Sequence, residues 1–256
     1  MKTPLIAYAG RGARPKVQLV FENLGEEDWG YGVKTIILGL NGKSTGYKAV
    51  FNKGKFVAIV GIKYRVLPNE QAVEIIEPIL KEHDFKIKWK DDDGVRLFIR
   101  AERSDGYGVV FRNAIDGSSA FRIYVTVPGK YFNAARILVA KIYAKHYDRS
   151  LENTIKAVKH FFSEEYMRLV KVIEETLEEL ERAEVTKEYL ELLEDKLPRK
   201  YLHGARYVAK KYGNPRAVLE YVAKNIWYAR VDDDYKITLF RTLLELTAAA
   251  FEFFRL

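Results

Sequence analysis

The sequence contains no cysteine and only two methionines among 256 residues. Without cysteine, disulfide bonds and thiolate metal sites are excluded. Scarce sulfur, together with abundant lysine and glutamate, fits a thermophilic source such as an archaeon.

Long hydrophobic runs are also missing. No apolar run approaches the roughly 20 residues that a membrane-spanning helix needs. The N-terminus lacks the layout of a signal peptide, because Arg11, Arg14 and Lys16 follow a short mixed segment. We therefore expect a cytoplasmic protein with no membrane partner.

Negative charge is in short supply in one part of the chain only. The formal net charge is +8; residues 1–150 carry 25 Lys and Arg against 16 Asp and Glu, and residues 151–256 carry 18 against 19. The excess positive charge of the first part suggests a polyanion partner such as nucleic acid. The alternative is a solvated basic surface that only keeps the protein in solution.

The hydrophobic period changes at about residue 150. Before it, short alternating runs predict strands, and an Asn-Gly pair at 41–42 predicts a hairpin. One helix is predicted within this part, over residues 70–82, with Asn69 as its N-cap. The predicted strands before the helix cover residues 33–40, 47–51, 56–60 and 61–67, with a further candidate at 16–21.

Apolar residues at helical spacing dominate the remainder. The predicted helices cover residues 132–147, 151–182, 186–197, 200–212, 216–230 and 237–254. The predicted fold class is therefore α+β. An antiparallel sheet domain with a basic face and a flanking helix, residues 1–150, precedes an all-helical region, residues 151–256, that packs on the sheet or extends from it.

Residues 85–127 alternate most clearly, and side chains alternate between the two faces of a strand. One set is apolar and should face a core: Phe85, Ile87, Trp89, Val95, Leu97, Ile99, Val109, Phe111, Phe121, Ile123 and Val125. The other set is basic with two aromatic residues: Lys86, Lys88, Lys90, Arg96, Phe98, Arg100, Arg112, Arg122 and Tyr124. The pattern predicts a sheet with a core face and a basic, partly aromatic face.

Motifs for catalysis are weak. Gly42-Lys43-Ser44 suggests a phosphate-binding loop, but that motif needs a glycine at position 37, where Ile37 stands, and a helix afterwards. The four histidines are scattered and give no metal-ligand spacing. Ser118-Ser119 lacks the context of a hydrolase nucleophile. A hairpin turn and structural histidines are the simpler interpretations.

Two acidic triplets and one polar turn leave alternatives open. Asp91–Asp93 and Asp232–Asp234 suit turns, where aspartate is favoured, but clustered carboxylates also serve metal-dependent nucleases. The turn at 113–120 combines Asp-Gly chemistry with small polar residues beside Arg112 and Arg122. It is either a simple hairpin connection or a place for a phosphate.

Three segments resemble a family of phage- and plasmid-borne proteins, domain of unknown function 932. These are residues 64–74 (YRVLPNEQAVE), 112–122 (RNAIDGSSAFR) and 144–148 (AKHYD), and residues 242–251 show a weaker similarity. The family's usual cysteine-containing segment is degenerate here, at residues 128–133. The resemblance implies a viral or plasmid setting and gives no activity by itself.

The predicted order of elements is also similar to the core of the single-strand annealing protein superfamily. That resemblance implies a homo-oligomeric ring or arc that binds DNA in a basic groove. Together with the basic sheet face, it predicts a DNA-binding recombination protein that anneals single strands without nucleotide hydrolysis. A metal-dependent nuclease and a non-enzymatic viral or plasmid interaction protein are the alternatives.

No catalytic residue, metal or cofactor is expected under the leading hypothesis, and whether the chain is an enzyme stays open, with a binding protein favoured. Single-stranded DNA is the expected partner. The candidate nucleic-acid-binding residues are Lys63, Arg65, Lys86, Lys88, Arg96, Phe98, Arg100, Arg112, Asn113, Ser118, Ser119, Arg122 and Tyr124.

Overall fold

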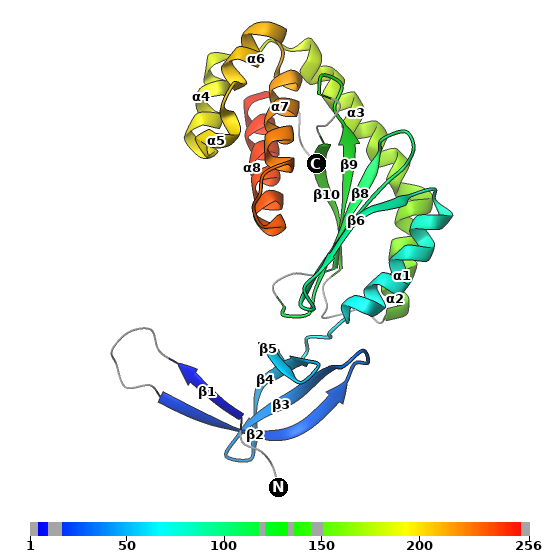
Figure 1. The fold of residues 1–256 in the computed structure, drawn as a ribbon, viewed down its shortest axis with the longest axis vertical. Helices are drawn as coiled ribbons and strands as arrows, with labels where there is room; N and C mark the ends of the chain where they lie inside the picture. Colours follow the sequence, from blue (N-terminus) through cyan, green and yellow to red (C-terminus); the bar gives the residue numbers. More distant parts are fainter. Residues whose placement is uncertain (1–4, 10–16, 118–120, 133–135, 145–150, 252–256) are drawn as a thin grey trace.

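The computed structural model describes residues 5–9, 17–117, 121–132, 136–144 and 151–251. Its N-terminal part is built from antiparallel sheets and its C-terminal part from helices, so the predicted α+β class is confirmed. Figure 1 shows two separate sheets joined by one passage of the chain, where the sequence suggests a single sheet.

The first sheet is an antiparallel meander in which each strand pairs with the next along the chain. Its strands are β1 (Leu5–Ala9), β2 (Val17–Asp28), β3 (Val33–Leu40), β4 (Lys43–Asn52) and β5 (Lys55–Gly61). The predicted strands at 33–40, 47–51 and 56–60 are confirmed as β3 and as parts of β4 and β5. The sequence pattern does not predict the length of β2, because a bulge between Asn23 and Gly25 interrupts its alternation.

The turn between β3 and β4 is a hairpin, as predicted. Asn41 and Gly42 both have positive φ, 52° and 74°, which a two-residue hairpin turn of this kind requires. Lys43 then opens a strand, so the helix that a phosphate-binding loop needs does not follow. The segment is therefore a turn.

The connection between the sheets differs from the prediction. Residues 61–67 do not form a further strand, because β5 ends at Gly61, and a turn at residues 62–63 and an irregular segment then lead to α1 (Asn69–Glu82). Tyr64 and Val66 of this segment are buried, and the Tyr64 hydroxyl donates to the Ala114 carbonyl over 3.0 Å. Their apolar alternation thus reflects packing between the sheets.

The second sheet is also antiparallel, in the order β10-β9-β8-β7-β6. Its strands are β6 (Lys86–Asp92), β7 (Arg96–Glu102), β8 (Gly108–Ala114), β9 (Phe121–Pro128) and β10 (Arg136–Ala144). The predicted helix at 132–147 is wrong, because its centre is β10. A bulge between Ala140 and Ile142 breaks the strand's alternation, and the apolar residues then imitate helical spacing.

The C-terminal half is helical, as predicted. Its elements are α2 (Leu151–His160), the π-helical turn η1 (Phe161–Glu165), α3 (Tyr166–Arg182), α4 (Lys187–Lys196), α5 (Arg199–Leu202), α6 (Ala205–Tyr212), α7 (Pro215–Trp227) and α8 (Asp233–Phe251). The helix predicted at 200–212 is divided at Gly204, which has a φ of 91°. In the described part of the chain, no helix combines the length and the apolar character needed to cross a bilayer.

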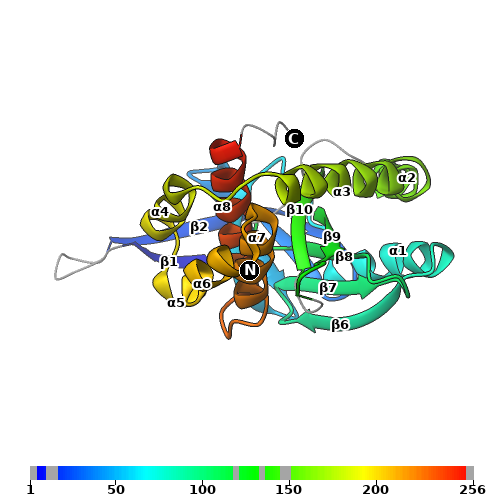
Figure 2. The same cartoon turned by 90° about the horizontal axis from the view of Figure 1, so that it is seen from above.

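Helices lie on both sides of the second sheet. Figures 1 and 2 show α1, α2 and α3 on one side and α7 and α8 on the other. One cluster of buried apolar side chains runs from α1 through β7, β8 and β9 into the C-terminal helices. The second sheet and the helical half therefore share one core, and the predicted basic face of the sheet is not open along its length.

Candidate nucleic-acid interface

Strand β6 is an exposed edge of the second sheet. It pairs only with β7, and every side chain from Lys86 to Asp92 is exposed. A bulge between Ile87 and Trp89 inserts Lys88 as an extra residue, so Trp89 pairs with Arg100. A one-residue shift moves the following side chains to the opposite face of a sheet. The prediction that Trp89 faces the core is therefore wrong. The Trp89 side chain is 43% exposed and lies on the same face of the sheet as Arg100, the face predicted to be basic.

Trp89 lies at a groove between this face and helices α7 and α8. The groove has a volume of about 470 Å³, within the range of ligand sites in proteins. It is called the tryptophan groove below. Its lining residues are Lys88, Trp89, Phe98, Arg100, Val110, Trp227, Asp233, Lys236, Ile237 and Phe240.

Aromatic contacts fix the far wall of the tryptophan groove. The Trp227 ring packs edge-on against Phe240, with 6.0 Å between centroids, and the Arg100 guanidinium lies 4.8 Å from the Trp227 ring centroid. Arg100 also donates to Glu102 from Nε and Nη2, over 3.1 and 2.7 Å. Trp227 and Arg100 therefore form a fixed wall, whereas Trp89 offers an exposed ring.

The groove and its rim carry more positive than negative charge. Lys88, Arg100 and Lys236 line it, against Asp233, which is 3.1 Å from the Lys236 ammonium. Lys86 pairs with Glu102 and lies on the face of the groove, as does Asp91, which pairs with Phe98, whereas Lys90 pairs with Ile99 and lies on the other face. Among the described residues, Lys86, Lys88 and Lys90 take part in no ion pair. Three free ammonium groups along one edge are suited to phosphate oxygens.

Arg96 and Arg112 are placed differently from the prediction. Arg112 is only 6% exposed, and its Nη2 donates to the Asp234 carboxylate at the start of α8. Arg96 Nη1 is 3.7 Å from Asp234 and 3.9 Å from Asp232. These guanidinium groups therefore bind carboxylates of the same chain in this structure.

Three other candidate residues are buried, so their expected exposure is wrong. Phe98 and Tyr124 are 6% and 2% exposed, which leaves their rings unavailable for stacking on bases. Asn113 is fully enclosed, and its amide donates to the Leu67 carbonyl and to Asn69 Oδ1 over 2.8 and 2.9 Å. The physical reason is that alternation assigns residues to a face but does not show that helices cover that face.

The remaining candidates lie in several places. Lys63 and Arg65 are exposed in the connection between β5 and α1, outside the groove. Arg122 is half-buried on β9, and its Nη1 lies 3.5 Å from the Tyr124 hydroxyl. Ser118 and Ser119 lie outside the described residues. Of the predicted set, the tryptophan groove brings together Lys88, Phe98 and Arg100, and Lys86 flanks it.

Both acidic triplets serve local structure. Asp92 accepts from the Asn69 amide over 2.7 Å, and Asp93 accepts from the backbone N–H groups of Val95 and Arg96 over 2.8 and 2.6 Å. Asp232 accepts from the backbone N–H of Asp234 over 2.9 Å. Within the described ranges, no group of three or more His, Cys, Asp or Glu residues is arranged to hold a metal ion.

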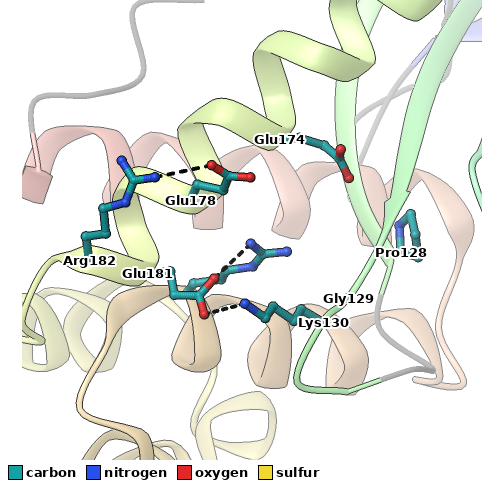
Figure 3. Close-up of a pocket in the computed structure, with 8 residues that line it drawn as sticks. Pro128, Gly129, Lys130, Glu174, Glu178, Glu181 and Arg182 are labelled. Atoms are coloured by element: carbon teal, nitrogen blue, oxygen red, sulfur yellow. Dashed lines mark hydrogen bonds and ion pairs between the residues drawn. The ribbon is translucent and has the colours of Figure 1, made fainter.

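A second cavity, of about 610 Å³, lies between α3, the start of α7 and the end of β9. Figure 3 shows Glu181 paired to Lys130, and Glu178 paired to Arg182. Glu181 also pairs with Arg216 over 3.2 Å. The hydrogen bond from Lys130 is the main cause that lowers the pKa of Glu181. Three carboxylates here face three cations, so this cavity has no excess charge to attract a polyanion.

Comparison with known proteins finds no relative of this chain. No protein-family model, no curated protein and no solved structure matches this chain. The resemblances described from the sequence therefore stay predictions.

The sequence pattern misses most of the tryptophan groove. Trp227, Asp233, Lys236, Ile237 and Phe240 come from α7 and α8, more than 100 residues after β6. No local signal links them to the sheet. The signal that the sequence does hold is the run Lys86–Lys90, in which a tryptophan stands between lysines.

Proposed function

We propose that this protein binds single-stranded nucleic acid along β6 and in the tryptophan groove. The observation that carries the proposal is the exposed Trp89 ring beside Lys86 and Lys88, which form no ion pair among the described residues, at the rim of a groove large enough for a nucleotide base. Proteins bind single strands by stacking bases on aromatic rings and by neutralising phosphates with Lys and Arg. Double-stranded DNA keeps its bases stacked inside, so a ring at this position favours single strands.

The decisive experiment measures binding of a labelled single-stranded oligonucleotide by fluorescence anisotropy. Trp89→Ala should weaken binding by about tenfold or more, because stacking contributes about 1–3 kcal/mol per base. Lys88→Ala should weaken binding less and reduce the salt slope by about 0.7, the value for one phosphate on a single strand. Tryptophan fluorescence should fall on binding, and that fall should be smaller in Trp89→Phe.

Matched controls lie on α6, where Tyr207 is 68% exposed and Lys210 is exposed. Tyr207→Ala and Lys210→Ala remove the same kinds of group and should leave the affinity unchanged. A folded Trp89→Ala protein that binds as tightly as the wild type would contradict the proposed site.

The resemblance to annealing proteins extends the proposal to strand annealing by a homo-oligomer. The test mixes complementary labelled strands and follows duplex formation with and without the protein, while light scattering gives the oligomer size. Annealing that is faster with the wild type and slower with Trp89→Ala supports this extension. A monomer that binds single strands without speeding annealing limits the function to binding.

The alternatives give different outcomes in the same assays. A metal-dependent nuclease would cut the labelled strand when Mg²⁺ or Mn²⁺ is added, and Asp→Asn changes in one acidic triplet would abolish cutting. An interaction protein with an acidic partner would bind an unrelated polyanion such as heparin as well as it binds the oligonucleotide.

A further inference from the structure

A cluster of two arginines and three aspartates lies beside the tryptophan groove. It is called the arginine–aspartate cluster and consists of Arg96 (β7), Arg112 (β8), Asp116 after β8, Asp232 just before α8, and Asp234 in the first turn of α8. Arg112 is bound to Asp234, and Arg96 lies 3.7 to 3.9 Å from all three carboxylates. Two of the three acids thus reach the sheet from a segment more than 100 residues away in the sequence.

The cluster adjoins the groove on two sides. The Arg112 guanidinium lies 5.5 Å from the Phe98 ring centroid, and Phe98 lines the groove. Asp233, between the two cluster acids of α8, lines the groove as well and pairs with Lys236. A nucleic-acid strand with one base in the groove would therefore have its neighbouring phosphate close to Arg96 and Arg112.

Asp234 is held in an unfavourable environment for a carboxylate. Burial raises its pKa, although Arg112 and Arg96 act in the opposite direction. Its Oδ1 atom is buried and accepts no hydrogen bond within the described part of the chain. A buried acceptor without a partner costs free energy, so this contact is weaker than its geometry suggests. Asp232 is more exposed, with 62% of its side chain open to solvent.

We infer that Asp232 and Asp234 are an internal competitor that occupies Arg96 and Arg112 in place of nucleic-acid phosphates. This inference rests on the proposed function and adds regulation to the same site. Asp234 accepts from Arg112 through one oxygen, and a phosphate can accept from a guanidinium through one or two, so the exchange keeps this arginine hydrogen bond. The competitor lowers the affinity for short or weakly bound strands, because each strand must displace the two aspartates before it contacts both arginines.

The test compares the Asp232→Asn/Asp234→Asn variant with the wild type in oligonucleotide binding across a salt series. Asparagine keeps a side-chain acceptor and removes the negative charge. The variant should bind about tenfold more tightly, and its salt slope should be steeper by about 1 to 1.5, as two further phosphates become neutralised. The matched control is Glu175→Gln/Glu178→Gln. It changes the net charge by the same amount at exposed positions on another helix, α3.

The outcomes distinguish failure of the internal competitor from failure of the proposed single-strand binding. An equal gain in the control pair overturns the competitor, because net charge alone then explains the effect. No gain in the double variant, with wild-type binding intact, also overturns it and leaves the proposed function standing. If no variant and no wild-type protein binds any oligonucleotide, the proposed function itself fails.

Because Arg112 is buried beside Asp234, loss of the Asp234 charge could unfold the double variant, and a single variant is therefore needed as well. Circular dichroism and thermal melting establish whether the double variant is folded. If it is not, Asp232→Asn alone carries the test, because Asp232 contacts only Arg96 of the two arginines and its turn hydrogen bond is kept by asparagine. A gain of about threefold supports the competitor, and an unchanged affinity overturns it.

Discussion

Glu220 on α7 is a charged side chain with none of its surface exposed. It accepts hydrogen bonds from the backbone N–H groups of Tyr131 and Phe132, over 2.7 and 3.3 Å, and from Arg216 Nε over 2.9 Å. It therefore joins the segment after β9 to α7. The buried carboxylate is tolerated because both of its oxygens accept hydrogen bonds.

Replacing Glu220 by alanine should lower the free energy of unfolding by about 3–5 kcal/mol, because the Tyr131 and Phe132 N–H groups lose their acceptor and the buried Arg216 is left with Glu181. Denaturant unfolding followed by circular dichroism measures this change. Glu175→Ala on the surface, which breaks only the exposed Lys171 pair, should change stability by less than about 1 kcal/mol. Similar losses in the two variants would contradict the special role of Glu220.

Tyr107 should make the stability of the folded protein depend on pH in the alkaline range. Burial is the main cause that raises its pKa from 10.0 to about 12, and its hydrogen bond to Glu174 adds to the effect. The folded state thus holds the phenol proton more tightly than the unfolded chain. The contribution is complete below pH 10.0 and is lost as the pH rises towards about 12.

The measurement is the free energy of unfolding between these two pH values for the wild type and Tyr107→Phe. Stability of the wild type should fall more steeply, since phenylalanine has no proton to lose. The difference between the proteins isolates Tyr107, because burial also raises the pKa values of Tyr166 and Tyr189 in both. Parallel curves would show that Tyr107 does not contribute.

At the scale of elements, the N-cap residues of α7 and α4 differ in the hydrogen bonds that they make. Asn214 caps α7, accepting from the Ala217 backbone N–H over 2.9 Å while its amide donates to the Tyr131 hydroxyl over 3.1 Å. Thr186 caps α4 and accepts only from the Tyr189 backbone N–H, over 3.1 Å. Asn214 therefore joins a helix start to another part of the fold.

Thr186→Ala should cost about 1 kcal/mol, the usual value for a lost N-cap. Asn214→Ala should cost more, about 2 kcal/mol, because a buried tertiary hydrogen bond is lost as well. Thermal or denaturant unfolding of the two variants compares them directly. An equal cost would mean that the contact with Tyr131 contributes nothing to stability.

The positions of most strands could be predicted from local patterns, but the face on which a side chain lies after a bulge could not. Strand β3 follows its expected bounds, because alternation and an Asn-Gly turn define it. Helix α1 begins one residue earlier than predicted, so that Pro68 and not Asn69 is its N-cap. Strands β6 and β10 each contain a bulge that shifts the alternation by one residue. The bulge on β6 has the larger effect on the site, because it turns Trp89 from the core to the groove.

At the scale of the whole molecule, charge distribution could be predicted but its pairing could not. The excess of basic residues in the first 150 residues is a property of the sequence alone. Whether Arg96 and Arg112 face water or the acids of α8 depends on how the helical half packs. No pattern within residues 85–127 contains that information, since the partners lie after residue 230.

The two sheets rest on cores of unequal size. Among the residues whose burial is described, which leave out β1 and the first part of β2, the cluster beneath the first sheet contains Val33, Val50, Val60, Tyr64, Val66 and Ile115, and the last three lie outside the sheet. Its interior is thus partly supplied by the connection and by the end of β8. Such a region should open by local unfolding at a lower free energy than the second sheet.

Hydrogen exchange followed by mass spectrometry should therefore find faster exchange in β3 and β4 than in β8 and β9. Val66→Ala should accelerate exchange in β3 and β4 and leave α7 unchanged, because Val66 packs in the smaller cluster only. Uniform protection across both sheets would contradict this. If the difference holds, the first sheet can detach and reattach while the tryptophan groove stays folded.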